Sequence, residues 1–182
     1  MTLVAVCGIP GAGKSTVAAR LKELGFDALD TDADGLACWR DRQTKTPVPD
    51  PADWHDPVAN GHIEYAVQRE RVVAVRSRAD SVDHPVYLCG FAGGEDEYWD
   101  LFDRVVMIAV DNETLRHRLA TRTTNSFGKA AHQRDATLAA NVGWAESYLG
   151  RGAVLVDGTR PLDEVVAAIL DVGEEPAPTQ AE

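Results

Sequence analysis

The sequence is poor in cysteine and in basic residues, and each shortage excludes a class of protein. Its 182 residues contain three cysteines, Cys7, Cys38 and Cys89, which are scattered and odd in number. This pattern indicates free thiols rather than a disulfide framework, and no Cys/His spacing typical of zinc sites occurs. The 18 basic and 29 acidic residues give a net charge of −11, which argues against nucleic acid or an anionic membrane as the main partner.

Long hydrophobic runs are also absent. No apolar stretch approaches the length that a membrane-spanning helix needs, and because the chain starts on a core strand we expect no signal peptide. Together with free thiols, these features predict a cytoplasmic protein. Its hydrophobic fraction of 45% and its length fit one globular domain. We expect no nucleic-acid or membrane partner, and a monomer or homodimer.

A glycine-rich stretch, Gly8–Thr16, lies between an apolar run and a helical pattern. In this strand–loop–helix context its G-x-x-x-x-G-K-[ST] pattern is typical of a phosphate-binding loop; a turn that binds nothing is the alternative. Glycines let backbone N–H groups surround an anion, and the helix N-terminus adds partial positive charge. We expect Lys14 to reach the β- and γ-phosphates of ATP and the Ser15 hydroxyl to hold Mg²⁺. The predicted nucleotide contacts here are Gly8, Gly11, Ala12, Gly13, Lys14, Ser15 and Thr16.

Short apolar strands alternate with helical patterns, which predicts an α/β fold with a parallel sheet covered on both faces. We expect strands over residues 2–7, 26–30, 85–89, 104–110 and 153–156. We expect helices over residues 14–24, 34–40, 58–79, 95–101, 112–123, 134–149 and 161–170. Residues 41–57 hold four prolines and predict a loop. One domain over 1–171 and a disordered tail over 172–182 complete the prediction.

Two carboxylates, Asp30 and Asp32, follow the second predicted strand. Ligands of open parallel sheets bind outside the carboxyl ends of the strands, and alternate residues of an extended segment point the same way. One carboxylate would orient Mg²⁺ or its waters, and the other would accept a proton from a substrate hydroxyl or fix the substrate. Helix capping by Asp32 or Asp34, or a solvated acidic turn, is the alternative.

Two arginines, Arg118 and Arg122, share one face of a predicted helix because they are four residues apart. Guanidinium groups bind phosphate oxygens and neutralise the charge that develops in phosphoryl transfer. We therefore predict a lid over residues 122–133, which closes on ATP; a solvated basic face is the alternative. Arg134, at the start of the next helix, either approaches the same phosphates or pairs with a surface acid.

The segment 33–84 is the predicted acceptor cap. Its helical stretch carries a polar stripe beside an apolar face, and that stripe is either part of the acceptor pocket or a solvated face. The stripe consists of His62, Tyr65, Arg69 and Arg76. The run Asp53–Asp56 either covers a polar substrate or anchors the loop, and Trp39 and Arg40 have the same two interpretations. The predicted acceptor contacts are Asp32, Arg40, His62 and Arg69.

Several of these residues resemble known kinases. Gly8–Thr16 followed by Leu29–Asp32 resembles shikimate kinase and gluconate kinase, which implies Asp30 for magnesium and Asp32 for substrate. The pair Arg118 and Arg122 is similar to the arginines entering the adenylate kinase lid. That likeness implies that Arg118 packs near the base or phosphates of ATP and that Arg122 touches the transferring phosphate.

Two further segments resemble adenylate kinase. Residues 157–161 look like its C-terminal segment, whose loop backbone contacts adenine, so Gly158 and Arg160 join the predicted nucleotide contacts. Residues 88–91 are similar to its third-strand ending, with Cys89 in place of an aspartate. Burial as a small apolar residue explains Cys89 better than a role in the site.

The resemblance implies a P-loop NTPase fold with three layers, a five-stranded parallel sheet of order 2-3-1-4-5, a short lid and an acceptor cap. It predicts an ATP- and Mg²⁺-dependent kinase in which Lys14 and Arg122 stabilise the transferred phosphoryl group and Asp32 orients or deprotonates the acceptor. A hydroxyl metabolite or nucleoside is the expected acceptor, because a carboxylate suits a hydroxyl better than a phosphate. The alternatives are a nucleoside-monophosphate kinase and, in another class, a nucleotide-binding regulatory ATPase.

Overall fold

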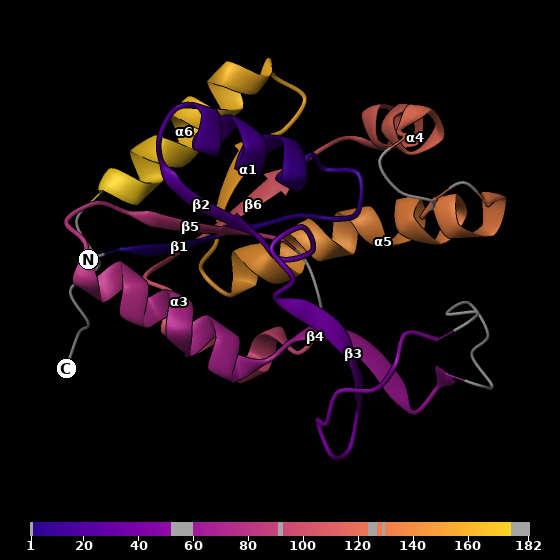
Figure 1. Cartoon of the computed structure of the whole chain (residues 1–182). Helices are drawn as coiled ribbons and strands as arrows, with labels where there is room; N and C mark the ends of the chain where they lie inside the picture. The colour runs from indigo at the N-terminus through magenta and orange to yellow at the C-terminus, as the bar shows by residue number, and fades with distance from the viewer. Residues whose placement is uncertain (1, 52–59, 91–92, 124–126, 129, 176–182) are drawn as a thin grey trace.

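The structure of the protein is a computed structural model that describes residues 2–51, 60–90, 93–123, 127–128 and 130–175. A central sheet is covered by helices on both faces, and a two-stranded hairpin extends beside it (Figure 1). The predicted α/β architecture of three layers is therefore confirmed.

The central sheet has five parallel strands. They are β1 (Leu3–Cys7), β2 (Asp27–Asp30), β5 (Val86–Cys89), β6 (Arg104–Ala109) and β7 (Val154–Asp157). The order is β2-β5-β1-β6-β7, with Leu3 opposite Val86 and Val4 opposite Arg104. Numbered among themselves along the chain, these strands run 2-3-1-4-5, as predicted. Strand β1 lies in the middle, so the loop that follows it starts at the centre of the sheet.

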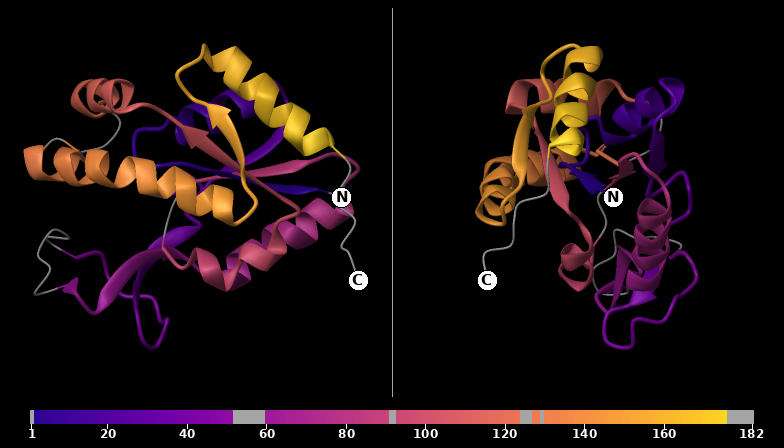
Figure 2. Two further views of the ribbon diagram at one scale, coloured as in Figure 1. Left: turned by 180° about the vertical axis from the view of Figure 1, so that it is seen from behind. Right: turned by 90° about the vertical axis from the view of Figure 1, so that its left-hand side faces the viewer.

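The alternation of side chains along β1 explains the two helical layers. Val4 and Val6 pack with α1 (Lys14–Glu23) and α6 (Leu162–Glu174) on one face. Leu3 packs with α3 (Arg69–Ser81), whereas Ala5 and Cys7 pack with α5 (Ala131–Gly150) on the other. Figure 2 shows these layers from behind and from the side. Because both faces are buried, the strand is continuously apolar rather than alternating with polar residues.

The remaining helices of the described residues follow β5 or β6 along the chain. They are η1 (Glu95–Glu97), η2 (Trp99–Leu101) and α4 (Asn112–Thr121). The Asp111 carboxylate caps α4 by accepting a hydrogen bond from the Thr114 N–H at 2.7 Å. Helix α6 continues to Glu174, so residues 172–174 are helical rather than part of the predicted tail. The rest of that tail, from residue 176, lies outside the described residues.

The cap differs most from the sequence prediction. Residues predicted to be helical instead form strands β3 (Ala37–Asp41) and β4 (Ile63–Val67), which pair as an antiparallel hairpin. Helix α3 begins only at Arg69. Over so short a run, apolar residues at positions 63, 66 and 67 fit the periodicity of a helix as well as that of a strand. Pairing with β3 stabilises the strand.

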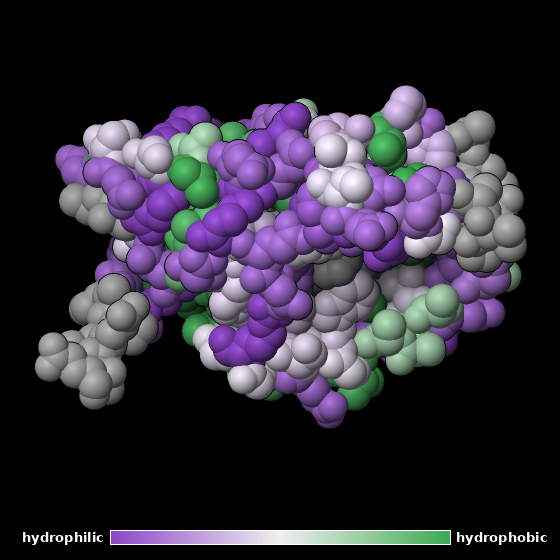
Figure 3. All heavy atoms as spheres, turned by 90° about the horizontal axis from the view of Figure 1, so that it is seen from below, coloured by the Kyte–Doolittle hydropathy of each residue, from purple (hydrophilic) through white to green (hydrophobic). Residues whose placement is uncertain are grey.

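The face that carries the hairpin and α3 is mostly hydrophilic, with hydrophobic side chains in small separate groups (Figure 3). Among the described helices none combines the length and the apolar composition needed to cross a bilayer.

Candidate active site

The Gly8–Thr16 loop connects β1 to α1. Gly11 and Gly13 have φ angles of 97° and 110°, a left-handed conformation that favours glycine. A Cβ at Gly11 would lie 2.8 Å from Leu115 Cδ1, so the backbone here packs directly against α4. This loop is suited to bind a triphosphate. Its glycines have left-handed conformations, its backbone packs closely on α4, and it leads into the N-terminus of α1.

Lys14 lies across this loop. Its ammonium donates hydrogen bonds to the carbonyls of Gly8 at 2.7 Å and Ile9 at 3.2 Å. The pKa of Lys14 is lowered to about 8, mainly by desolvation and in part by the Arg122 guanidinium, whereas Asp32 and Asp30 oppose this shift. The side chains of Asp30, Asp32 and Arg122 are thus close enough to affect Lys14 electrostatically.

The two carboxylates after β2 have different environments. Asp30 is buried, and its Oδ1 accepts hydrogen bonds from the backbone N–H groups of Asp32 at 2.9 Å and Ala33 at 3.0 Å. Asp32 is exposed and accepts a hydrogen bond from the Tyr65 hydroxyl at 3.1 Å. Asp34 instead accepts from the Asp30 N–H and Lys22, so its role is structural. Asp30 therefore shapes the turn, and Asp32 presents its carboxylate at the surface.

The pKa of Asp32 is raised above the usual aspartate value. Partial desolvation is the main cause, and the negative charge of Asp30 adds to it, whereas the hydrogen bond from Tyr65 and the charge of Lys14 act in the opposite direction. A carboxylate with a raised pKa accepts a proton more readily than an ordinary surface aspartate does. Asp32 is thus better suited than Asp30 to proton transfer.

The donor set for magnesium is small but chemically suitable. Ser15 is exposed at the start of α1, and Asp30 follows β2 at the same edge of the sheet. Within the residues described, no three His, Cys, Asp or Glu side chains are grouped to hold a metal ion. A hydroxyl and one carboxylate fit Mg²⁺, which keeps several of its waters and binds nucleotide phosphates as well.

Arg118 ties three segments together. Its guanidinium donates to the Ala12 carbonyl of the loop at 2.9 Å and to the Gly158 carbonyl after β7 at 2.7 Å. Gly158 itself packs on β6, because a Cβ there would lie 2.5 Å from Ile108 Cγ2. The structure thus joins Arg118, Gly158 and the loop, whereas Arg160 is exposed and pairs with Glu164.

Arg122 follows α4 directly at the start of the predicted lid. Its Nε donates to the Phe127 carbonyl at 3.0 Å, and its guanidinium lies 5.5 Å from the centre of the Phe127 ring. Burial lowers the pKa of Arg122 below the usual arginine value. Arg134 donates to the Gly128 carbonyl at 3.1 Å, so it contacts the backbone of the predicted lid. Residues 124–126 and 129 of the lid lie outside the described residues.

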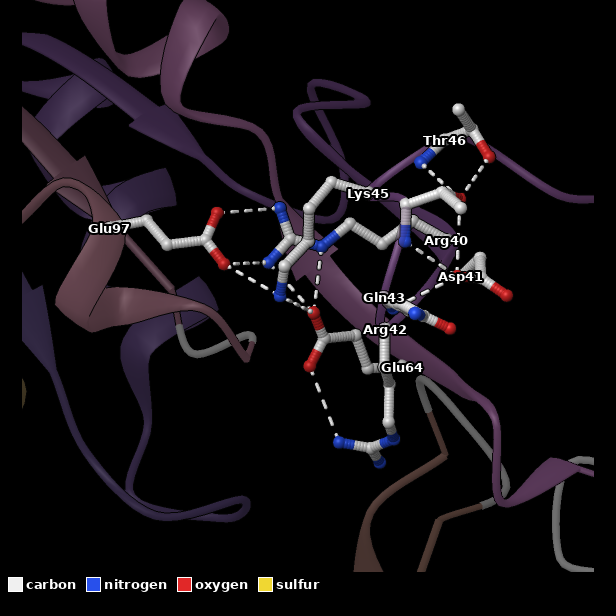
Figure 4. A network of polar contacts seen from close by, with 9 residues as sticks. Arg40, Asp41, Arg42, Gln43, Lys45, Thr46, Glu64 and Glu97 are labelled. Atoms are coloured by element: carbon white, nitrogen blue, oxygen red, sulfur yellow. Dashed lines mark hydrogen bonds and ion pairs between the residues drawn. The ribbon is translucent and has the colours of Figure 1, made fainter.

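The predicted acceptor contacts in the cap are dispersed. Arg40 is 1% exposed, and its guanidinium bonds Glu64 on β4 and Glu97 on η1 (Figure 4). Such burial corrects our expectation that Arg40 contacts an acceptor, because its donors are already directed at two carboxylates. Arg69 is bonded by Asp100 at 2.6 and 2.7 Å. His62 is exposed just before β4, and residues 53–56 lie outside the described part of the chain.

The sequence did not predict the contact between Tyr65 and Asp32. Tyr65 had been placed in a helical stripe, whereas in the structure it lies on β4, 33 residues from its partner. Tyr65 lies opposite Trp39 on β3, and such aromatic pairs are typical of strands. The pairing joins residues far apart in the sequence, so the residues around Tyr65 gave no signal of it.

Comparison with known proteins adds to this geometry. Residues 4–138 match the family model described as AAA domain. No curated protein sequence matches the chain. Among solved structures, deoxyadenosine kinase from M. mycoides with bound dATP is 18% identical and matches with a TM-score of 0.51, over 93% of this chain and 97% of that one.

Two further structures are similar. A sugar kinase from Janibacter sp. is 16% identical, with a TM-score of 0.50 and 94% of each chain covered. A gluconokinase from Sinorhizobium meliloti is 20% identical, with a TM-score of 0.47, over 93% of this chain and 90% of that chain. The deoxyadenosine kinase and the Janibacter kinase share the fold of this chain.

Proposed function

We propose that this chain, which belongs to the AAA domain family, is an ATP-dependent kinase. It would transfer the γ-phosphoryl group to a hydroxyl of a small molecule. The grouping of Lys14, Asp30, Asp32 and Arg122 supports this proposal. Lys14 lies in the loop after β1, the two carboxylates lie at the end of β2, and the charges of Asp30, Asp32 and Arg122 all act on Lys14. Cations to stabilise a phosphoryl group and a carboxylate to receive a proton are what phosphoryl transfer to a hydroxyl requires.

On the donor side, the backbone of Gly8–Thr16 binds the phosphates of ATP. Lys14 exchanges its bonds to the loop carbonyls for the β- and γ-phosphates, and Arg122 contacts the transferring group from the lid. Ser15 and Asp30 would hold Mg²⁺, which would supply positive charge to the phosphate oxygens. Arg118 fixes the loop against Gly158, near which the adenine would lie, and Arg160 is kept only as a peripheral contact.

On the acceptor side, Asp32 receives the hydroxyl proton while the acceptor oxygen bonds to the γ-phosphorus. The bond from that phosphorus to the bridging oxygen of ATP breaks, and ADP leaves. Tyr65 orients the carboxylate for this transfer, and the raised pKa of Asp32 favours proton uptake. His62 remains a proposed acceptor contact because it is exposed at the entry to β4.

The charges of the cap favour a neutral acceptor. Every Lys and Arg of its described part bonds a carboxylate or, for Arg71, the Gly35 carbonyl. These side chains are Arg40, Arg42, Lys45, Arg69, Arg71, Arg76 and Arg78. A bound phosphate or carboxylate would have to displace an acid from one of them. This argues against a nucleoside monophosphate and for a neutral hydroxyl compound.

A coupled assay of ADP release tests the proposal with purified protein, ATP, Mg²⁺ and a panel of neutral hydroxyl compounds, nucleosides and nucleoside monophosphates. We expect turnover that depends on one class of acceptor, and we expect Asp32→Asn to lower kcat about 100-fold or more at unchanged ATP affinity. Slow ATP hydrolysis that no acceptor accelerates, and that Asp32→Asn leaves intact, would favour the regulatory ATPase instead.

A further inference from the structure

The hairpin places two aromatic rings beside Asp32. Trp39 on β3 and Tyr65 on β4 are directly opposed, so their side chains project from the same face. Their ring centres are 5.5 Å apart, with the planes inclined by 56°. Both residues remain partly exposed, so the pair keeps an accessible surface, while Tyr65 also packs against the apolar cluster that includes Leu3 and Val67.

The hydroxyl of Tyr65 establishes which way this surface faces. It donates to Asp32 Oδ1 at 3.1 Å, so the aromatic face of the hairpin adjoins the carboxylate that receives the acceptor proton in the proposed reaction. A molecule whose hydroxyl meets Asp32 would therefore extend along Tyr65 toward Trp39.

The opposite face of the hairpin holds this surface in place. Arg40 and Glu64 project away from the aromatic pair, and Arg40 bonds Glu97 on η1 at 2.7 and 2.9 Å (Figure 4). Lys45 bonds both carboxylates, at 3.0 Å for Glu64 and 2.9 Å for Glu97. Because the aromatic wall is fixed before a ligand arrives, less ordering is needed on binding.

We propose that Trp39 and Tyr65 form the wall of the acceptor site and that the acceptor is a neutral compound with a planar heteroaromatic ring, of the nucleoside type. This inference rests on the proposed kinase function and names its substrate class. A heteroaromatic ring packs on the aromatic faces without needing a free cation, and it offers them a larger flat apolar surface than a polyol does.

Binding of named probes to the full chain tests this inference. Saturating Mg²⁺ and a non-hydrolysable ATP analogue fill the donor site, and calorimetry then measures binding of thymidine, guanosine, glucose and myo-inositol. We expect a nucleoside to bind and the two polyols not to. Trp39→Ala should weaken nucleoside binding about 5- to 100-fold, and Trp39→Phe, which keeps a ring, should lose much less. Val73→Ala, on the exposed side of α3, is the matched control.

Two outcomes would overturn the inference. One is binding of glucose or myo-inositol in preference to both nucleosides; the other is nucleoside binding that is unchanged in Trp39→Ala. The affinity of each variant for the ATP analogue alone reports whether the donor site is intact. Failure of the wild-type protein to bind that analogue would count against the kinase proposal itself, and analogue binding without nucleoside binding would count against the ring inference only.

Discussion

At the scale of single residues, the chemistry depends on the environment of two side chains. Lys14 is desolvated in the loop, which brings its pKa to about 8, and Asp32 is partly desolvated, which raises its pKa. Both shifts bring the pKa closer to neutrality, where proton uptake and loss are possible at ordinary pH. The two groups act on one another, so a change at either is felt at the other.

The affinity of the protein for a non-hydrolysable ATP analogue should fall as the pH rises through about 8. Below that pH the Lys14 ammonium is charged in the free protein; above it the free protein must take up a proton before it pairs with phosphate. We expect up to about tenfold weaker binding for each pH unit above 8. Calorimetry over pH 7–10 measures this, and Lys14→Arg should abolish the decline, because arginine stays charged. An equal decline in Lys14→Arg would contradict the assignment.

The Tyr65→Phe variant should raise the pKa of Asp32 further. The Tyr65 hydroxyl donates to the charged carboxylate and so favours it; without that bond the protonated form persists to higher pH. Carbon NMR of aspartate-labelled protein measures the titration, and Asp32→Asn identifies the signal. An unchanged or lower Asp32 pKa in Tyr65→Phe would show that the hydroxyl does not stabilise the carboxylate.

At the scale of elements, a buried arginine links the hairpin to η1. Arg40 is nearly inaccessible to solvent and forms ion pairs with Glu64 on β4 and Glu97 on η1, two segments far apart in the sequence. Without Arg40, the exposed Lys45 would be the partner shared by Glu64 and Glu97, and removing one member of a buried charge cluster costs more than the intact cluster contributes. The ion pairs of Arg40 thus join the hairpin to η1.

Arg40→Met should destabilise the protein by about 3 kcal/mol, because it removes the buried cation between the Glu64 and Glu97 carboxylates and leaves them the exposed Lys45 as their shared partner. Urea denaturation measures the change. Combining it with Glu64→Gln should recover part of the loss, since one of the two carboxylates is then neutral. Arg42→Met is the matched control: this arginine contacts Glu64 at 3.3 Å from an exposed position, so we expect about 0.5 kcal/mol or less. Equal losses in the two single variants would contradict a special role for Arg40.

At the scale of the whole molecule, the site is assembled from segments at one edge of the sheet. The loop after β1, the turn after β2, the end of α4 and the segment after β7 meet there, and Arg118 bonds two of them. A ligand that contacts all of these segments stabilises the folded chain as a unit, because the unfolded chain has no such site.

An ATP analogue with Mg²⁺ should therefore raise the stability of the whole chain, by about 2.7 kcal/mol at 100 times its dissociation constant. Thermal unfolding followed by circular dichroism measures the shift. Chelation of Mg²⁺ should remove most of it if Ser15 and Asp30 hold the ion, and Ser15→Ala should do the same. A shift that is insensitive to chelation would contradict the proposed metal site.

The sequence by itself determined the sheet and the loop. The apolar strands and the glycine pattern at Gly8–Thr16 are local signals, because a buried parallel strand and a phosphate cradle each require particular residues at adjacent positions. The secondary structure of the cap, by contrast, was decided only by tertiary contacts. Whether residues 63–67 form a helix or a strand depended on contacts with β3 and Asp32, which lie more than 20 positions away. Arg40 was expected to contact the acceptor, but it is buried between carboxylates. One of these, Glu97, is far from Arg40 in the sequence, so local sequence signals could not reveal the contact.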